Sequence, residues 1–284
     1  MLYMNPNRRD FLKKSSIASA GLAILPSFLN ATNFTSSATF GATYMGDFAA
    51  PKLETVRCAF IGVGARGSGH ATRIANIEGT EIVSICDLYE DWATNTANKC
   101  KEIGAGERHN EISLYTGGEN EWKKMLKKEK PDLVFISTSW KTHASMAIYS
   151  MKKGAHAMVE VPIAITIKEM WDIVDTSEKT KKHCMMLENV NYGREELLYL
   201  NMCRQGVLGE LLHGEASYIH ELKWQMNEVE RGTGSWRTPH YANRNGNLYP
   251  THGLGPVAQY MNLTRGEDNF KRIVSMSSPG KGRN

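Results

Sequence analysis

The sequence is poor in the residue patterns that build disulfide or metal centres. Its 284 residues include five cysteines, an odd number, which are widely spaced and form no CxxC pair. We therefore predict neither a disulfide framework nor a zinc site, and we expect the cysteines to pack in the interior. The nine histidines form no HExxH motif, so we expect no catalytic metal.

The sequence also lacks a strong charge of either sign. With 41% hydrophobic and 23% charged residues, its composition is typical of a soluble globular protein long enough for two domains. The formal net charge is +4, and most of this excess comes from four basic residues and one acid within residues 1–30. We therefore expect neither a nucleic acid nor a membrane as a partner.

The N-terminal segment has the pattern of an export signal. Arg8 and Arg9 lie in the stretch NRRDFLKK, and an apolar run over residues 17–29 follows that is too short to span a membrane. Paired arginines before such a run are typical of a twin-arginine signal, the alternative being an amphipathic helix or an anchor. We predict a signal peptide and the start of a linker over residues 1–38, a linker over 39–54, and export to the periplasm or cell surface of a bacterium.

The alternation of apolar strands and helices predicts an α/β domain over residues 55–190. Strands that are separated by helices pair in parallel, so we expect a Rossmann domain with a doubly wound parallel sheet. The predicted strands are VRCAFIGVG (56–64), EIVSICD (81–87), a short one near Leu114, KPDLVFIST (130–138), AHAMVE (155–160) and HCMMLE (183–188), and the predicted helices span 71–77, 90–103, 143–154 and 168–179.

The character of the chain changes within residues 191–284. After a helix predicted at 195–204, the stretch GELLHGEASYIHEL (209–222) alternates apolar and polar residues, as a strand with one covered face does. We predict a substrate-binding α+β domain with a mainly antiparallel sheet. Because little chain follows this stretch, we expect that domain to be truncated and the chain to be a fragment.

A dinucleotide-binding motif follows the first predicted strand. Gly62, Gly64 and Gly67 stand in G-x-G-x-x-G register and open a helix, an arrangement that brings a pyrophosphate to the helix N-terminus. The triplet alone is a weak signal, but Asp87 ends the next strand 20 residues after Gly67, where it can accept hydrogen bonds from a ribose diol. Its carboxylate would repel a 2′-phosphate, which favours NAD over NADP.

Three further segments follow predicted strands and so lie where such sheets bind ligands. They are STSWKTH (137–143), VEVP (159–162) and LENVNY (187–192). Trp140 could cover a ring of the cofactor. His143 could cap a helix or contact the cofactor, and it could equally be an N-terminal helix residue with no ligand.

At these segments the chain resembles the glucose-fructose oxidoreductase and inositol dehydrogenase family, whose members carry this Rossmann domain and an EKP signature. In that family the lysine of the signature assists removal of a hydroxyl proton during hydride transfer. This sequence has Glu160-Val161-Pro162. The absent lysine weakens the interpretation as a simple sugar dehydrogenase.

The stretches VEVP, ENVNYGREEL and GSWRTPHYANRNGNLYPTHGLGP, with the twin-arginine start, resemble one branch of that family, the NAD-dependent glycoside hydrolases of family 109. Known members are α-N-acetylgalactosaminidases. The resemblance runs from the signal to the last residue, and YPTHGLGP is its most specific part. It implies NAD contacts from Ala65, Arg66, Asp87, Trp140 to His143, Glu160, Val161 and Asn189, and sugar contacts from Tyr218, Arg237, Tyr249, Pro250, Thr251 and His252.

The resemblance also implies a redox-assisted route that needs no pair of carboxylates. NAD oxidises the sugar at C3, which makes the C2 proton acidic; the C1 substituent is eliminated, water adds, and the same NADH returns the hydride. General bases with tunable pKa suit this path. We assign His252 to acid/base work at C2 or the leaving group, and Tyr249 to proton transfer or oxyanion support. Arg237 and Tyr218 would orient the sugar.

The sequence alone leaves alternatives open. Tyr-Pro is a common turn pair, and Gly253, Gly255 and Pro256 predict a rigid loop in which Tyr249 and His252 simply pack. The chain could also be an ordinary NAD-dependent sugar dehydrogenase, or a non-catalytic remnant that binds cofactor or glycan. The expected partner is a glycan with terminal N-acetylgalactosamine, and a homo-oligomer is left open.

Overall fold

The computed structural model describes residues 44–103, 109, 111–244, 246–263 and 268–278. The predicted signal peptide over residues 1–38 lies outside the described residues, as does the first part of the predicted linker. The described part of that linker contains one short 3-10 helix, Met45–Asp47.

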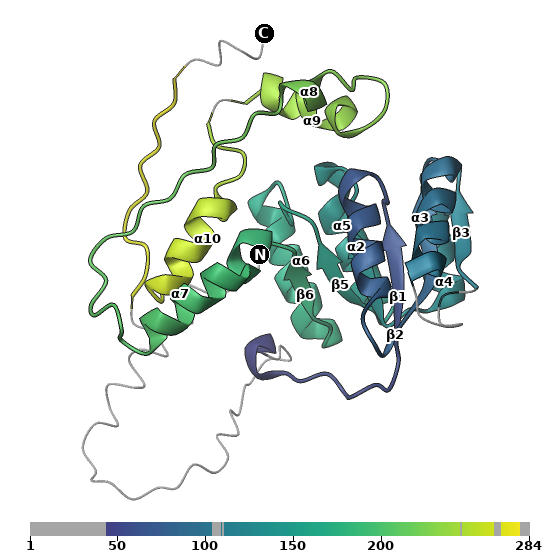
Figure 1. Ribbon diagram of the computed structural model, residues 1–284, viewed down its shortest axis with the longest axis horizontal. Coiled ribbons are helices and arrows are strands. Elements are labelled where there is room, and N and C mark those ends of the chain that lie inside the picture. Colours follow the sequence, from purple (N-terminus) through teal and green to yellow (C-terminus); the bar gives the residue numbers. More distant parts are fainter. Residues whose placement is uncertain (1–43, 104–108, 110, 245, 264–267, 279–284) are drawn as a thin grey trace, which may run out of the picture. The chain divides into compact units, whose positions relative to one another are not determined.

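A six-stranded parallel sheet forms the centre of the fold, in the order β3-β2-β1-β4-β5-β6 (Figure 1). Every neighbouring pair is parallel, which confirms the predicted doubly wound sheet. The order reverses between β1 and β4, and ligands of such sheets bind at this reversal. The strands are β1 (Val56–Ile61), β2 (Thr80–Asp87), β3 (Ser113–Thr116), β4 (Leu133–Ile136), β5 (His156–Val159) and β6 (Cys184–Met186).

Helices cover both faces of this sheet, and β1 shows why. Its successive side chains point to opposite faces. Cys58 and Phe60 join a core cluster with residues of α2 and α3, whereas Ala59 and Ile61 join one with residues of α4 and α5. The strand is therefore buried on both sides. The helices are α2 (Ala65–Ala75), α3 (Glu90–Ile103), α4 (Glu121–Glu129), α5 (Trp140–Lys152) and α6 (Ile167–Thr180).

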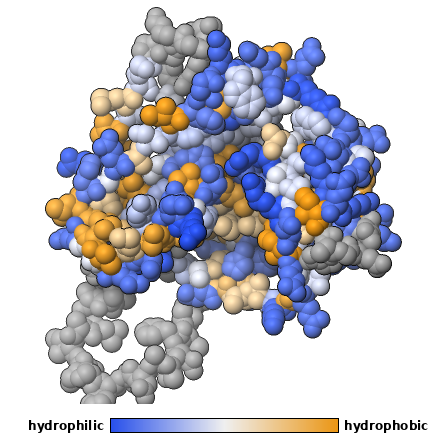
Figure 2. Space-filling view, in the orientation of Figure 1, coloured by the Kyte–Doolittle hydropathy of each residue, from blue (hydrophilic) through white to orange (hydrophobic). Residues whose placement is uncertain are grey.

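All the regular structure after β6 is helical within the described residues. The short helix η3 (Asn189–Tyr192) leads into α7 (Arg194–Arg204), followed by α8 (Lys223–Met226), α9 (Thr233–Ala242) and α10 (Thr251–Tyr260). Helix α10 packs against both η3 and α7. Figure 2 shows apolar side chains gathered at the left of the view, where α7 and α10 lie. The exposed leucines of these helices are Leu197, Leu198 and Leu254.

The strand predicted at 209–222 is wrong, and so is the mainly antiparallel sheet for this part of the described chain. Residues 210–222 form neither a strand nor a helix. A strand needs a neighbouring backbone to receive its hydrogen bonds, and no described segment pairs with these residues. Leu212 and Ile219 are left outside the core, 84% and 92% exposed, whereas Leu222 at the end of the stretch is buried.

The loop predicted around Gly253, Gly255 and Pro256 is also wrong, because these residues lie inside α10. The glycines serve close packing. A Cβ on Gly253 would lie 3.0 Å from the Cβ of Ala216, and one on Gly255 would lie 2.7 Å from Oδ1 of Asn191. Because these positions have no Cβ, α10 can lie directly against Ala216 and Asn191.

None of the described helices is both long and apolar enough to cross a membrane.

Candidate active site

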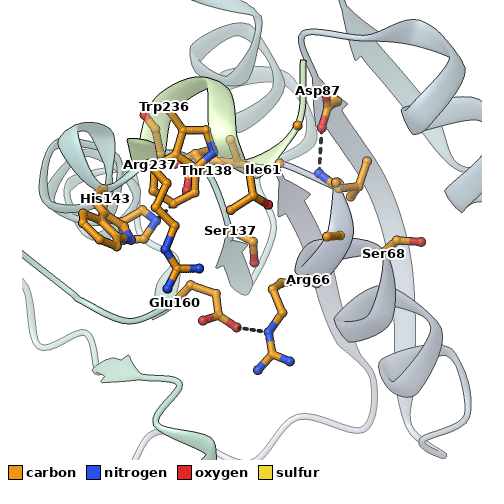
Figure 3. Close-up of a pocket in the computed structure, with 18 of the residues that line it drawn as sticks. Ile61, Arg66, Ser68, Asp87, Ser137, Thr138, His143, Glu160, Trp236 and Arg237 are labelled. Carbon is orange, nitrogen blue, oxygen red and sulfur yellow. Dashed lines mark hydrogen bonds and ion pairs between the residues drawn. The ribbon is translucent and has the colours of Figure 1, made fainter. Parts of the chain in front are cut away.

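One cavity of about 1540 Å³ opens at the carboxyl ends of the central strands, and it gathers most of the residues singled out from the sequence. Figure 3 shows Arg66 from α2, Glu160 from the end of β5, and Trp236 and Arg237 from α9 around the same space. Four predicted site residues, Gly67, Lys141, Pro250 and Thr251, do not line it. Those that do are Gly62, Gly64, Ala65, Arg66, Asp87, Trp140, Thr142, His143, Glu160, Val161, Asn189, Tyr218, Arg237, Tyr249 and His252.

The glycine-rich turn has the geometry of a phosphate cradle. Gly62 has a φ of 82°, and a Cβ there would lie 2.7 Å from the carbonyl oxygen of Ser137. Gly67 does not reach the cavity, but a Cβ on it would lie 1.9 Å from the carbonyl oxygen of Gly62. Helix α2 starts without a side-chain cap at Gly64, so the N–H groups of its first turn are available to an anion.

Asp87 sits at the end of β2 and supports this turn. Its Oδ2 accepts a hydrogen bond from the N–H of Val63 at 2.7 Å, drawn in Figure 3, and its Oδ1 accepts one from Tyr89 at 2.9 Å. Burial raises the pKa of this carboxyl, and the two backbone hydrogen bonds oppose the shift. The carboxylate thus holds the turn in place and retains lone pairs for a ribose.

Glu160 is held by two groups from α2. Its Oε1 lies 2.6 Å from Nε2 of His70 and 3.5 Å from Nε of Arg66. Burial alone would raise the pKa of Glu160, but the hydrogen bond with His70 and the charge of Arg66 outweigh it, so the net pKa is lowered. His70 was not identified from the sequence, because nothing in the sequence pairs it with a residue 90 positions away.

Val161 takes the position of the family's lysine and makes an apolar contact there. It is 5% exposed and packs in a cluster with Trp140 and Tyr249. At this point of the cavity the chain therefore offers no amine for proton transfer.

His143 is fully buried and stabilises the wall of the cavity through contacts with two backbone carbonyls. Its Nδ1 lies 2.8 Å from the carbonyl oxygen of Pro162 and its Nε2 lies 3.0 Å from that of Thr138. Burial lowers its pKa, with the two backbone contacts opposing the shift. Because both ring nitrogens face backbone carbonyls, the ring joins two loops at the carboxyl edge of the sheet.

Trp140, at the start of α5, is the centre of an aromatic cluster. Its ring centroid lies 4.8 Å from that of His240, 5.3 Å from that of Trp236 and 5.4 Å from that of Tyr249. It is 3% exposed. Trp236 also lines the cavity, although the sequence alone gave it no role. The cluster joins α5 to α9 and to the segment before α10.

Tyr218, Tyr249 and His252 form a group of three rings in the cavity wall. The rings of Tyr249 and His252 are stacked, with centroids 5.4 Å apart and an interplanar angle of 2°. Tyr218 lies 5.3 Å from Tyr249 and 5.1 Å from His252. Tyr249, just before α10, and His252, in its first turn, are three residues apart, and the turn at the start of the helix brings them together. Burial raises the pKa of Tyr249 and of Tyr218, so both phenols are hydrogen-bond donors at neutral pH.

Arg237 on α9 brings positive charge to these rings. Its guanidinium carbon lies 4.6 Å from the ring centroid of Tyr249, and the charge opposes the rise in that phenol's pKa. Nη1 donates to Gln225 and Nη2 to the hydroxyl of Tyr241, each at 3.2 Å. Nε is buried and has no partner within the described part of the chain.

Two further residues at the site were given no role from the sequence, although Glu188 lies in the segment LENVNY. Glu188, 1% exposed, lies 2.7 Å through Oε1 from Nδ1 of His252. Nη2 of Arg231 donates to both carboxylate oxygens of Asp91 at 2.7 Å, and the guanidinium stacks 4.2 Å above the rings of Tyr89 and Trp92, which line the cavity. Among the described residues, no group of three or more His, Cys, Asp or Glu side chains could hold a metal ion.

Comparisons with known proteins show which families the chain is similar to. Residues 56–188 match the family model of the oxidoreductase family with an NAD-binding Rossmann fold, and residues 192–284 match the C-terminal domain of glycosyl hydrolase 109. A glycosyl hydrolase family 109 protein of Akkermansia muciniphila is 63% identical over 86% of this chain. An α-N-acetylgalactosaminidase of Shewanella oneidensis is 50% identical over 98% of it.

The chain spans 50% of the length of the Akkermansia relative and 60% of that of the Shewanella relative. Among solved structures, scyllo-inositol dehydrogenase from Lactobacillus casei with bound NAD(H) and scyllo-inositol matches with a TM-score of 0.58 at 16% identity, over 73% of this chain and 56% of that one. At this identity the match shows the shared fold.

Proposed function

The chain belongs to glycoside hydrolase family 109, and from this premise we propose that the protein is an NAD-dependent α-N-acetylgalactosaminidase. Its substrate would be a glycan with a terminal α-linked N-acetylgalactosamine, hydrolysed by a redox-assisted elimination and addition. One observation carries the proposal: a single cavity joins the dinucleotide motif to the stacked Tyr249 and His252.

The residues at the nucleotide end of the cavity fit NAD. Gly62 and Gly67 leave room that any Cβ would fill, the N-terminus of α2 is uncapped, and Asp87 holds a carboxylate at the end of β2. Asn189 and Glu160 line the same cavity further along. NAD, when bound, supplies a reversible oxidant, so that the sugar is oxidised and reduced again within one turnover.

His252 and Tyr249 supply the proton chemistry in this proposal. His252 is the side chain suited to take a proton from the sugar and return it, because a histidine can work in both directions near neutral pH. Tyr249 keeps its proton, since burial raises its pKa, and so acts as a donor to an oxygen on which negative charge develops. Arg237 and Tyr218 orient the sugar against these two rings.

Val161 supports a glycosidase over a simple sugar dehydrogenase. A dehydrogenase of the related type uses a lysine amine at this position, whereas here the position is apolar and buried in the cluster with Trp140 and Tyr249. Removal of the proton then falls to a group elsewhere in the cavity, and the ring of His252 is available there.

The test is hydrolysis of a chromogenic α-N-acetylgalactosaminide by the full-length protein with a catalytic amount of NAD. Aglycone release without net NADH is the expected result. Accumulation of NADH would indicate a sugar dehydrogenase instead, and failure of both would indicate a non-catalytic protein that binds cofactor or glycan.

The variant His252→Ala should bind NAD as the wild type does and lose turnover by about 10²–10⁴-fold, the usual contribution of a general acid/base. His213→Ala is the control, because that histidine is exposed and does not line the cavity. Unchanged hydrolysis by His252→Ala would remove the assignment of this ring.

A further inference from the structure

Glu188 is a buried carboxylate that contacts the ring assigned to proton transfer. It is 1% exposed and precedes η3, while His252 lies in the first turn of α10, 64 residues later. Oε1 of Glu188 and Nδ1 of His252 are 2.7 Å apart. Packing of α10 on η3 brings the two side chains together.

This contact links the tautomer of His252 to the carboxyl of Glu188. An ionised carboxylate only accepts hydrogen bonds, so with Glu188 ionised Nδ1 carries the hydrogen and Nε2 of a neutral ring keeps its lone pair. Within the described residues the His252 ring makes no other hydrogen bond. The ring lines the cavity and is confined by Tyr249 and Tyr218, which leaves Nε2 for a substrate.

Capping of η3 does not account for the arrangement. Oε1 accepts a hydrogen bond from the N–H of Val190 at 2.9 Å, and that bond alone would cap the short helix. A smaller residue exposed to solvent could do the same. Instead Oε2 of Glu188 is buried with no partner among the described residues, an arrangement that costs free energy. A helix cap needs no contact with His252, so capping does not explain why Glu188 is buried beside this ring.

We propose that Glu188 is a positioning residue for His252. It holds the imidazole with Nδ1 protonated, directs Nε2 at the cavity, and stabilises the imidazolium that forms when Nε2 takes a proton from the substrate. That proton moves from the sugar to Nε2 and returns later, and Glu188 stays a carboxylate throughout. The role of His252 as a base rests on the proposed function, whereas its tautomer does not.

The tautomer can be measured without any activity, by NMR of the protein with ¹⁵N-labelled histidine. The His252→Ala variant identifies the signals of this ring. In the wild type we expect a protonated Nδ1 and an unprotonated Nε2, and in Glu188→Ala a mixture of both tautomers. A wild-type ring protonated at Nε2, or the same tautomer in Glu188→Ala, would overturn the proposal.

Kinetics then separate positioning from folding. Glu188→Ala should lower kcat by up to about 10⁴-fold, as loss of an orienting carboxylate does elsewhere, with KM nearly unchanged. In the His252→Ala background the same change should have almost no further effect, because both residues act through one ring. If the kcat reduction in the double variant equals the product of the reductions in the two single variants, Glu188 acts independently of His252. That result would contradict the proposal.

Two further variants guard against a trivial loss of stability. Glu188→Gln keeps an acceptor for the N–H of Val190 but loses the charge, so it should fold as the wild type does and still show a lowered kcat. Thr166→Ala removes the capping box of α6, away from this pair, and should lower stability without changing kcat. If the wild type releases no aglycone, the proposed function fails, and the NMR experiment still decides the role of Glu188.

Discussion

At the scale of single residues, Glu160 gives the site a pH-dependent anchor. Its pKa in the folded protein lies below its ordinary value of 4.5, despite burial, because of His70 and Arg66. A carboxyl with a lowered folded-state pKa stabilises the fold above its unfolded pKa, and this contribution is lost as the pH falls through the folded-state pKa. We expect the free energy of unfolding to decline as the pH drops below about 4.5.

Urea unfolding of Glu160→Gln at several pH values checks this expectation. The variant lacks the titrating group, so its free energy of unfolding should decline less steeply with falling pH. Glu121→Gln removes a carboxylate from the surface pair with Lys124 and should keep the wild-type slope. Parallel curves for the wild type and Glu160→Gln would contradict the prediction.

Two glycines of α2 make a matched pair for testing the phosphate cradle. A Cβ on Gly67 would lie 1.9 Å from the carbonyl oxygen of Gly62, whereas one on Gly69 would meet only the flexible end of Arg73 at 3.3 Å. Gly67→Ala should therefore destabilise the protein by about 1–3 kcal/mol and weaken NAD binding. Gly69→Ala should be neutral or stabilise it by up to about 1 kcal/mol through helix propensity.

Calorimetric unfolding and NAD titration of both variants measure these effects. If Gly67→Ala unfolds at the wild-type temperature and binds NAD equally well, the close approach of α2 to β1 has no bearing on the nucleotide.

The sequence indicated the residues of this cavity where a motif or a strand end marked them. Asp87 and the glycines could be identified from their spacing in the dinucleotide-binding motif. Tyr249 and His252 could be identified because they are three residues apart in the YPTHGLGP stretch. Glu188 could not be found in this way, since an acid after an apolar strand is common and its partner is distant in sequence. The same holds for His70 and Arg231. Their roles arise only when the fold brings separate elements together.

At the scale of elements, prediction worked where periodicity and burial agree. The buried parallel strands are short apolar runs between helices, and the structure has them at the predicted places. The stretch 209–222 has the right alternation for a strand but no paired neighbour in the described chain, so its pattern could not specify a strand by itself. In α10, glycines that normally interrupt a helix are explained by close neighbours that no sequence pattern shows.

Arg231 joins the α8–α9 segment to the Rossmann domain. It pairs with Asp91 on α3 and stacks on Tyr89 and Trp92. Each cation–π contact of this kind contributes about 0.5–1 kcal/mol at exposed sites. We predict that Arg231→Ala increases amide hydrogen exchange across residues 223–242 several-fold and leaves the exchange of β1 and β4 unchanged.

The conservative variant Arg231→Lys should behave almost like Arg231→Ala, because lysine keeps the charge but loses the planar stack on Tyr89 and Trp92. Lys168→Ala removes an exposed pair with Asp172 on α6 and serves as the control. Unchanged exchange in residues 223–242 would show that Arg231 does not hold this segment.

At the scale of the whole molecule, two family models match two consecutive parts of the chain. The NAD-binding Rossmann model matches residues 56–188, and the C-terminal domain of glycosyl hydrolase 109 matches residues 192–284. The two parts share one cavity, whose walls come from the carboxyl ends of the strands on one side and from α9 and α10 on the other. A ligand that fills the cavity should therefore stabilise both parts together. The melting temperature in the presence of nucleotide therefore shows whether both parts form the site together.

We predict that NAD raises the melting temperature and that NADP raises it much less. At about 100-fold above its Kd, a ligand of the folded state adds about 2.7 kcal/mol, which is roughly 5–10 °C for a protein of this size. The carboxylate of Asp87 accepts a ribose diol but repels a 2′-phosphate, so NADP should bind weakly. In Asp87→Asn, where the charge is lost and an acceptor remains for the turn, the two shifts should approach each other. Differential scanning fluorimetry with each nucleotide decides the matter, and equal shifts in the wild type would show that Asp87 does not select the cofactor.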